Sequence, residues 1–200
     1  MRVVVATRNR GKLVEIAALL ARADLELVTI DDIAPGAELR EEGQTFEDNA
    51  LAKARQAAAA CRLPAIADDS GLEVDALGGA PGVYSARYAG MPSDDARNNG
   101  KLLAALAAVV ADRRSARFRC AASFVDRARG IELVRMGHVD GRILTAARGT
   151  GGFGYDPLFL VPALGRTMAE LTLVEKNQLS HRARAFHALA DALASGSAND

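Results

Sequence analysis

The stretch ADDSGLEVDALGGAPGVYSARYAG, residues 67–90, begins where the apolar run 63–67 ends. Two adjacent aspartates, Asp68 and Asp69, therefore stand directly after a segment that is typical of a short buried strand. Adjacent carboxylates repel each other, and burial disfavours their charged forms. Because Asp, Ser and Gly are also turn formers, the pair has two interpretations. It is either a surface turn or a strand end that directs one carboxylate at a metal ion or a water molecule.

The composition indicates a globular chain that is poorly suited to binding nucleic acid. Its 200 residues fit one domain, with room for two lobes. The 25 Lys and Arg residues balance the 25 Asp and Glu residues, so the chain lacks the basic surface that general nucleic-acid binding needs. Only 4% of residues are aromatic and none is Trp, which leaves few side chains for stacking on bases.

The cysteines and the N-terminus indicate a cytoplasmic protein. Cys61 and Cys120 are the only cysteines and form no CxxC pair, so we expect neither a zinc site nor an oxidising compartment. The apolar run at residues 3–6 is too short for a signal peptide or a membrane span. We therefore expect no membrane partner.

The pattern of apolar residues predicts an α/β protein. Strands are expected at residues 3–6, 25–30, 63–67, 116–124 and 131–139. A helix is expected after the first strand, and three more at 45–61, 93–110 and 180–194. Thr45 and Asp48 form a capping box for the first of these three, Ser93 caps the second and Ser180 caps the last. Residues 68–92 are expected to form a long loop, and 195–200 a frayed tail. The alternation near 116–139 favours a sheet that is partly antiparallel.

The segment ATRNRGK, residues 6–12, places cations at the wrong end of a helix. A helix N-terminus favours anions, yet Arg8, Arg10 and Lys12 gather there. These side chains either point into solvent or clamp a phosphate. In the second case Gly11 lets the backbone N–H groups approach the anion.

Two further positions break the same local rules. Lys53 lies about 20° around the helix from Phe46, inside an apolar stripe. It either extends to the rim or pairs with a phosphate or carboxylate in a cleft. In EKNQLSHR, residues 175–182, His181 and Arg182 occupy a first helical turn and Lys176 lies just upstream. Together these cations indicate a polyanionic ligand between lobes.

The segment GTGGFGYDP, residues 149–157, has only the spacing of a weak GxGxxG pattern and stands at no clear strand–helix junction. Its glycines either form a tight structural turn or wrap a flat ligand, with Phe153 or Tyr155 as the stacking surface.

Acidic residues complete the set of candidates. Glu41 and Glu42 precede the Lys53 helix, and Asp68 and Asp69 follow it. Mg²⁺ in phosphate chemistry is commonly held by one or two carboxylates, and a carboxylate near the metal can deprotonate water. We therefore expect one Asp of the pair to face the site and the other to be structural.

Taken together, these segments resemble the Ham1-type inosine/xanthosine triphosphate pyrophosphatases. The matching segments are 7–12, 41–54, 67–90, 149–159 and 175–182, in the order of the family and over nearly the whole chain. The resemblance implies one domain over 1–200, with a two-lobed, mixed-sheet α/β fold, helices on its faces and a central substrate cleft. It also implies Mg²⁺ dependence and a homodimer. The implied reaction converts ITP, dITP or XTP to the monophosphate and pyrophosphate.

Carried over by position, the resemblance implies a role for each matching residue. Asp69 is the general base and forms the metal site with Glu41. The residues that hold the triphosphate are Thr7, Asn9, Gly11, Lys12, Lys53 and Lys176. The residues that contact the substrate, the last few at the sugar and base, are Ser70, Phe153, Gly154, Tyr155, Asp156, His181 and Arg182. His181 or Arg182 is expected to donate to the O6 acceptor of hypoxanthine, which adenine lacks.

Two positions depart from the commoner family pattern, and other functions stay open. Arg8 stands where many relatives carry a small residue, and Glu42 where Thr or Asp is frequent. The alternatives are a Maf-type pyrophosphatase of related fold, a nucleotide sensor without turnover, and a small RNA-binding module. The base and metal pair of Asp69 and Glu41 argues against a sensor, and the zero net charge argues against RNA binding.

Overall fold

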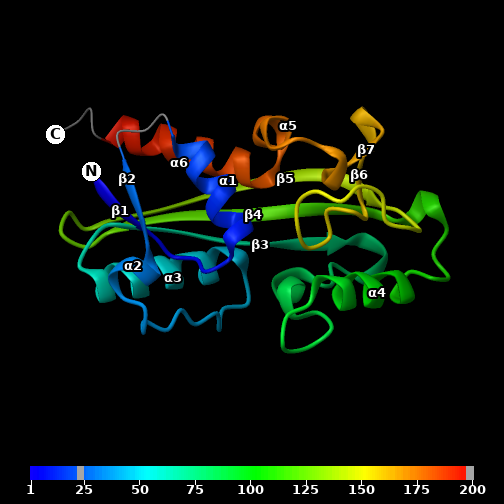
Figure 1. Cartoon of the computed structure of the whole chain (residues 1–200), viewed down its shortest axis with the longest axis horizontal. Coiled ribbons are helices and arrows are strands. Elements are labelled where there is room, and N and C mark those ends of the chain that lie inside the picture. Colours follow the sequence, from blue (N-terminus) through cyan, green and yellow to red (C-terminus); the bar gives the residue numbers. More distant parts are fainter. Residues whose placement is uncertain (22–24, 197–200) are drawn as a thin grey trace. The chain divides into compact units, whose positions relative to one another are not determined.

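The computed structural model describes residues 1–21 and 25–196, which form seven strands and six α-helices in an α/β arrangement (Figure 1). The strands are β1 (Arg2–Val5), β2 (Glu26–Thr29), β3 (Ala65–Val74), β4 (Ser115–Asp126), β5 (Ile131–Ile143), β6 (Phe159–Val161) and β7 (Arg166–Thr167). The helices are α1 (Arg10–Leu20), α2 (Ile30–Ile33), α3 (Phe46–Cys61), α4 (Asp95–Ala105), α5 (Leu173–Leu179) and α6 (His181–Gly196).

The strands form one mixed sheet in the order β2-β1-β3-β4-β5-β6-β7. β1 pairs in parallel with β2 and β3, whereas β6 pairs antiparallel with β5 and β7. The prediction of an α/β fold with a partly antiparallel sheet is therefore confirmed.

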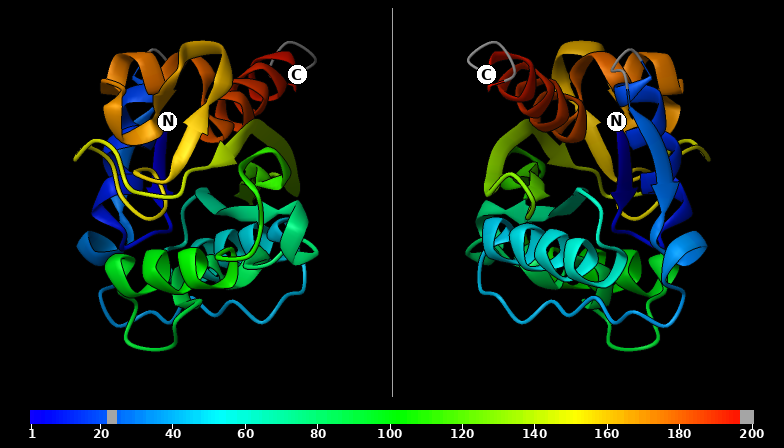
Figure 2. Two further views of the ribbon diagram at one scale, coloured as in Figure 1. Left: turned by 90° about the vertical axis from the view of Figure 1, so that its right-hand side faces the viewer. Right: turned by 90° about the vertical axis from the view of Figure 1, so that its left-hand side faces the viewer.

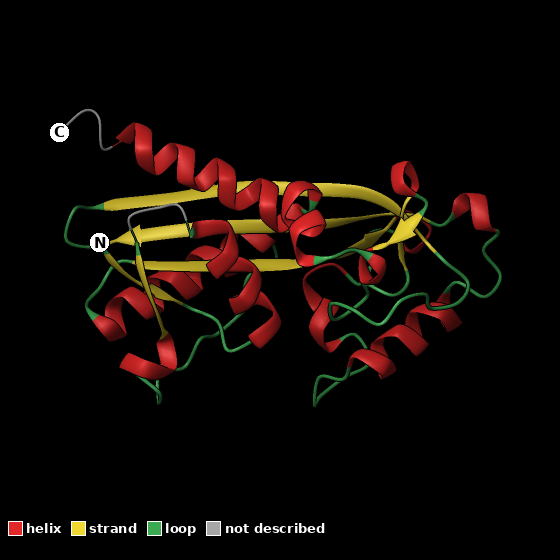
Figure 3. Ribbon diagram, turned by 45° about the horizontal axis from the view of Figure 1, so that its top comes forward, coloured by secondary structure: helices red, strands yellow, loops and turns green. Residues whose placement is uncertain are grey.

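The chain divides into two compact units, and three of the strands, which are drawn in yellow in Figure 3, contribute residues to both. Unit 1 comprises Met1–Asp69, Cys120–Gly137 and His181–Asp200, and unit 2 comprises Ser70–Arg119 and His138–Ser180. β3, β4 and β5 each contribute residues to both units, and the boundary in β3 falls directly after the aspartate pair.

Unit 1 has helices on both faces of its strands. Side chains alternate between the two faces along a strand, and this alternation separates two apolar cores. Val5 and Ile66 pack on the face covered by α1 and α6, which lie side by side, whereas Val4 and Ala67 pack on the face covered by α3 (Figure 1). Neighbouring residues of β3 therefore meet different helices.

Unit 2 encloses a core of its own. Leu72 and Phe118 from the strands pack with Leu102 of α4 and with Phe159 of β6. The rings of Phe118 and Phe159 lie 4.4 Å apart between centroids. β6, β7 and α5 lie in a segment for which the apolar pattern predicted no element, because strands of three and two residues are too short to show a period.

Side-chain caps explain several helix starts. The Thr45 hydroxyl accepts from the Asp48 N–H at 3.1 Å, and α3 begins at the next residue, Phe46. The Asn9 carbonyl oxygen caps α1 in the same way by accepting from the Lys12 N–H. α6 begins at His181, directly after Ser180, as predicted.

The prediction that a strand ends at residue 67 and a loop follows was wrong. β3 continues through both aspartates to Val74, and residues of the expected loop form short 3₁₀ segments at Asp75–Leu77 and Gly82–Arg87. The strand continues because cations from other elements neutralise the buried carboxylates, which the local sequence does not show.

The predicted bounds of α4 were also wrong at both ends. Asp94 caps the helix by accepting from the Arg97 N–H at 2.8 Å, whereas the Ser93 hydroxyl donates to the Ala86 carbonyl. The helix ends at Ala105, and the buried Arg114 guanidinium binds the carbonyls that follow, at Leu106 and Val109. These carbonyls are therefore satisfied without a further helical turn.

The last helix is longer than predicted. α6 includes residues 195 and 196, which were expected to belong to a frayed tail, and residues 197–200 of that tail lie outside the described part of the chain. Within the described ranges 1–21 and 25–196, no helix is long and apolar enough to cross a membrane.

Gly137 of β5 lies very close to the backbone of α6. A Cβ at this position would lie 2.2 Å from the His181 carbonyl oxygen and 2.5 Å from the Ala185 nitrogen, both backbone atoms. We expect Gly137→Ala to lower the free energy of unfolding by about 3 kcal/mol or more, because the helix must move. Urea denaturation measures the change.

Gly100→Ala is the matched control, since a Cβ at that position of α4 meets nothing within 4 Å. It should raise the stability by about 1 kcal/mol through helix propensity. Equal stabilities of the two variants would contradict the close packing of α6 on β5.

Candidate active site

The two aspartates of β3 point to opposite faces of unit 1. Asp68 shares the parity of Ile66 and therefore faces α1 and α6, whereas Asp69 shares the parity of Ala67 and faces α3. Both are buried, with exposures of 0% and 5%. One strand thus places adjacent carboxylates in two separate environments.

Asp68 is held by two cations. Its Oδ2 lies 3.1 Å from Lys12 Nζ and accepts from Arg182 Nη2 at 3.0 Å and from Arg182 Nε at 3.2 Å. Burial by itself raises the pKa of Asp68, but the charges of Lys12, Arg182 and Lys53 outweigh it and hold that pKa well below its usual range. Asp68 is therefore ionised at any physiological pH.

Arg182 is shared between two carboxylates. While Nε and Nη2 bind Asp68, Nη1 donates to the buried Glu15 of α1. Burial by itself lowers the pKa of Arg182, but the charges of Asp68 and Glu15 outweigh it and raise that pKa above its ordinary value. The guanidinium therefore stays charged. The first turn of α6 is thereby joined to α1 and β3.

Asp69 lies in a different setting. Its Oδ2 accepts from Asn49 Nδ2 at 3.0 Å, and its Oδ1 lies 3.8 Å from Lys53 Nζ. Burial raises the pKa of Asp69, Lys53 and Lys12 lower it, and Glu41 raises it; the net pKa lies above that of an ordinary aspartate. A buried carboxylate with a raised pKa is the property expected of a general base.

Lys53 joins Asp69 to Glu41. It is 6% exposed on α3 and forms a short ion pair with Glu41. Burial lowers the pKa of Lys53, but the charges of Asp69, Glu41 and Asp68 together raise it above the ordinary value. The loop that carries Glu41 is anchored on α3, because the Gly43 N–H donates to Asn49 Oδ1 at 2.8 Å.

Glu41 and Asp69 fit a weakly ligated Mg²⁺ better than a closed metal cage. In the described part of the chain, no group of three or more His, Cys, Asp or Glu side chains could hold a metal ion. Mg²⁺, however, is usually bound by one or two carboxylates, with water and substrate phosphates as the other ligands. Two carboxylates close to one lysine supply that donor set.

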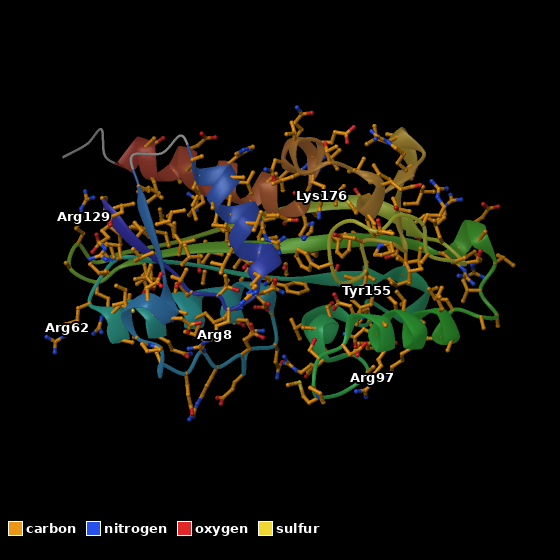
Figure 4. The ribbon with its side chains drawn as sticks, viewed as in Figure 1. Arg8, Arg62, Arg97, Arg129, Tyr155 and Lys176 are labelled. Carbon is orange, nitrogen blue, oxygen red and sulfur yellow. The ribbon has the colours of Figure 1, made fainter. Side chains whose placement is uncertain are left out.

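The start of α1 brings together only part of the predicted phosphate site. The Thr7 hydroxyl accepts from the Asn9 N–H at 3.2 Å, and Asn9 caps the helix. Arg8 is directed elsewhere (Figure 4): its Nε lies 2.8 Å from Asp31, and its Nη2 donates to the carbonyls of Pro35 and Ala37. Arg8 thus holds the loop after α2.

Unit 2 holds a second group, built around the carboxylate of Asp156. Its Oδ2 accepts from the Phe153 N–H at 3.0 Å and from Lys176 Nζ at 2.8 Å. The ammonium of Lys176 also lies 5.5 Å from the centroid of the Phe153 ring. A Cβ at Gly152 would lie 2.0 Å from Asp156 Oδ2, so this close approach requires glycine.

Tyr155 belongs to the core of unit 2. Tyr155, labelled in Figure 4, is 4% exposed, and its hydroxyl donates to the Ser85 carbonyl at 2.8 Å. Of the two aromatic residues proposed as stacking surfaces, the half-buried Phe153 is therefore the more exposed one.

Comparison with known proteins identifies the family. The chain matches the Ham1 family over residues 3–192. The chain belongs to the Ham1 family. It is 53% identical over 192 residues to a dITP/XTP pyrophosphatase of Geobacter sulfurreducens, with 96% of each chain covered. It is 50% identical over 197 residues to a dITP/XTP pyrophosphatase of Escherichia coli, covering 98% of this chain and 99% of the other. A solved HAM1 protein of Coxiella burnetii superposes with a TM-score of 0.88 at 41% identity, covering 98% and 99% of the two chains.

The residues predicted from the Ham1 resemblance fall into two groups and a remainder. Unit 1 brings together Glu41, Lys53 and Asp69 on one face of β3 and Lys12 and Arg182 on the other. Unit 2 brings together Phe153, Asp156 and Lys176. Of the remaining residues, Ser70 is half-buried in β3, His181 is buried at the start of α6, Gly11 lies in the first turn of α1 and Arg10 is exposed.

Glu15 and Asn49 belong to the site, although neither was predicted from the sequence. Glu15 follows Lys12 by three residues and precedes the buried Ile16, so helical spacing places a carboxylate beside a cation on a face that is partly apolar. That pattern could have marked Glu15. Asn49 precedes Lys53 by four residues on α3, and no local pattern shows that it contacts Asp69.

The Ham1 chain should lose stability when Arg182 is removed. Arg182→Met leaves Asp68 and Glu15 buried with one fewer cation, and breaking a buried ion pair costs about 3–5 kcal/mol. Replacing Glu15 by Gln in the same variant should recover part of this loss, since Lys12 still pairs with Asp68 and no second buried carboxylate is left without a cation. Denaturant unfolding measures both, and an unaltered stability of Arg182→Met would contradict the role assigned to the guanidinium.

The pKa of Asp69 should respond to its two charged neighbours in opposite directions. In metal-free protein, Glu41→Gln should lower that pKa because a negative charge is lost, and Lys53→Met should raise it because a positive charge is lost. Carboxyl ¹³C NMR titration of Asp69 measures both shifts. Glu132→Gln, which removes an exposed partner of Arg55, is the control and should leave the Asp69 titration unchanged.

Proposed function

We propose that this Ham1 chain hydrolyses the non-standard purine nucleotides dITP, ITP and XTP to the monophosphate and pyrophosphate. The observation that carries the proposal is the environment of Asp69, a buried carboxylate of raised pKa that contacts Asn49 and lies beside Lys53. Relatives named dITP/XTP pyrophosphatase, about half identical over nearly the full length, support the choice of substrate.

The chain's own residues perform the proton transfer. Ionised Asp69 accepts a proton from water, and Asn49 orients the carboxylate by donating to Oδ2. The oxygen of that water forms the new P–O bond, the α,β-anhydride bond breaks, and pyrophosphate leaves. Because Lys53 stays protonated, it holds charge against the reacting phosphates without competing for the proton.

Glu41 and Asp69 are the proposed ligands of Mg²⁺. When bound, the ion neutralises phosphate charge and makes bound water more acidic. Glu41 already lies against Lys53, and Lys53 lies beside Asp69, so one lysine stands between the two carboxylates that would bind the metal ion.

The proposed phosphate contacts are Thr7, Asn9, Gly11, Lys12, Lys53 and Lys176. Lys12 lies against Asp68 in the structure, with 14% of its side chain exposed. Since Arg182 binds the same carboxylate, Lys12 can turn towards a phosphate while Asp68 keeps a cation. Arg182 would thus permit Lys12 to act on the substrate.

The other proposed substrate contacts, the last few at the sugar and base, are Ser70, Phe153, Gly154, Tyr155, Asp156, His181 and Arg182. Selection of hypoxanthine over adenine by a donor to O6 stays a prediction. Of the two proposed donors, Arg182 already gives Nε, Nη1 and Nη2 to carboxylates. His181 is therefore the better candidate for the contact with O6.

Further properties belong to the same proposal. We propose that residues 1–200 act as one enzyme domain, that the enzyme is a cytoplasmic homodimer, and that it needs neither nucleic acid nor a membrane. Membership of the Ham1 family sets aside the Maf-type alternative. The relatives named dITP/XTP pyrophosphatase argue against a nucleotide sensor without turnover.

The test is incubation of the purified protein with ITP and Mg²⁺, with identification of the products. We expect IMP and pyrophosphate, and no turnover in EDTA. Asp69→Asn should fold normally and lose about 10²–10⁴-fold in kcat, the usual contribution of a general base.

Glu47→Gln is the control for Asp69→Asn, because Glu47 lies in the first turn of α3 and belongs to none of the contacts above. It should keep the kcat of the wild type. Formation of IDP and orthophosphate, or full activity in EDTA, would contradict the proposed reaction. A near-normal kcat of Asp69→Asn would remove Asp69 as the base.

A further inference from the structure

Two polar side chains of α4, one helical turn apart, bind the backbone of the same residue in the glycine loop. The carboxylate of Asp95 accepts from the Gly154 N–H at 2.6 Å. The side-chain amide of Asn99 donates to the Gly154 carbonyl at 2.9 Å. Positions i and i+4 share a helix face, so α4 forms hydrogen bonds with both the N–H and the carbonyl of Gly154. Figure 2 (left) shows α4 in green and the glycine loop in yellow.

The two hydrogen bonds from Asp95 and Asn99 to Gly154, here called the grip of α4, hold the loop in one backbone conformation. Gly154 has a φ of +60°, the left-handed region, while a Cβ there would meet nothing within 4 Å. Space therefore does not force the turn at this point. The two hydrogen bonds from α4 hold it, because each fixes one side of the residue.

The backbone of Phe153 is held by hydrogen bonds on both sides of its Cα. Its own N–H donates to Asp156 Oδ2, and the next residue, Gly154, is bound by Asp95 and Asn99. Both peptide groups that flank the Phe153 Cα are thus fixed, the second by Asp95 and by the Asp156 N–H, which donates to the Phe153 carbonyl at 3.2 Å. Asn99 fixes the peptide group that follows Gly154. The direction of its ring then depends on α4 as well as on Asp156.

Asn99 is a costly residue for stability alone. Its Oδ1 is buried and has no hydrogen-bond partner among residues 1–21 and 25–196. A buried unsatisfied acceptor offsets most of what the bond from Nδ2 contributes. The gain from an amide at this position is therefore the placement of Gly154.

We propose that Asp95 and Asn99 are positioning residues that hold Phe153 for stacking on the purine, so that α4 sets the affinity for the base without touching it. This inference rests on the proposed function. Because every base presents a π-face, stacking is tolerant of base identity. The pair should therefore govern how tightly purine nucleotides bind, and not which purine is preferred.

The main test is Asn99→Asp, which keeps the shape of the side chain but cannot donate to the Gly154 carbonyl. We expect KM for ITP to rise about tenfold, a part of what one stacked base contributes, with kcat within about twofold of the wild type. The ratio of kcat/KM for ITP to that for ATP should stay unchanged. Hydrogen exchange of the Gly154 amide should become faster.

A matched pair at Asp95 separates the hydrogen bond from the charge. Asp95→Asn keeps an oxygen that can accept from the Gly154 N–H and should have a KM near that of the wild type. Asp95→Ala keeps neither oxygen and should raise KM as Asn99→Asp does. A rise in both variants would show that charge, and not the grip on Gly154, matters.

Gly100→Ala separates positioning from the stability of α4. This substitution should stabilise the helix, so the double variant Asn99→Asp/Gly100→Ala should recover the melting temperature of the wild type but not its KM. If KM recovers together with stability, Asn99 is merely structural and the proposal is overturned.

Equilibrium binding of IMP makes the outcome independent of turnover. Weaker binding by Asn99→Asp and Asp95→Ala supports the grip even if the wild type releases no pyrophosphate, a result that would refute only the proposed reaction. Unchanged IMP binding in both variants, or faster Gly154 exchange without a change in KM, overturns the proposal. A wild type that binds no IMP but releases pyrophosphate from ITP overturns the inference and leaves the proposed reaction standing.

Discussion

The burial of the Asp68 carboxylate is the constraint on which the rest of unit 1 depends. A carboxylate at 0% exposure is tolerable only with well-placed cations. Two of them, Lys12 and Arg182, come from the first turns of α1 and α6, and Glu15 of α1 balances the second. The cluster therefore sets where both helices begin relative to β3, and it does so with a set of four side chains whose formal charges cancel.

The same constraint determines the setting of Asp69. Because side chains alternate along β3, fixing Asp68 towards α1 and α6 directs Asp69 towards α3, where Asn49 and Lys53 meet it. The pKa values of two adjacent carboxylates are thereby moved in opposite directions, that of Asp68 down and that of Asp69 up. One group is then a permanent anion that organises cations, and the other can exchange a proton in a reaction.

Unit 2 uses a carboxylate in a related way, but to shape backbone. Asp156 binds both the Phe153 N–H and Lys176, and Asp95 and Asn99 bind Gly154 from α4. A loop rich in glycine has many accessible conformations, so each of these bonds removes a freedom that the sequence of the loop leaves open. The backbone around Phe153 is therefore held by Asp156 within the loop and by Asp95 and Asn99 outside it.

Several features could be predicted from the sequence because their causes are local. Apolar periodicity located β1, α1 and α3, the cap at Thr45 located the start of α3, and helical spacing placed Lys53 on a buried face. The motifs of segments such as 41–54 indicated the Ham1 family, and the family match confirmed it. By contrast, the continuation of β3 past residue 67 and the partners of Glu15 and Asn99 were decided only by the tertiary structure. The physical reason is that the stability of a buried charge or amide depends on its partners, which can lie far away in the sequence. Arg182 is 114 residues from Asp68, and Gly154 is 55 residues from Asn99. A pattern within one segment shows that a polar group is out of place, and only the folded chain shows which distant group compensates it.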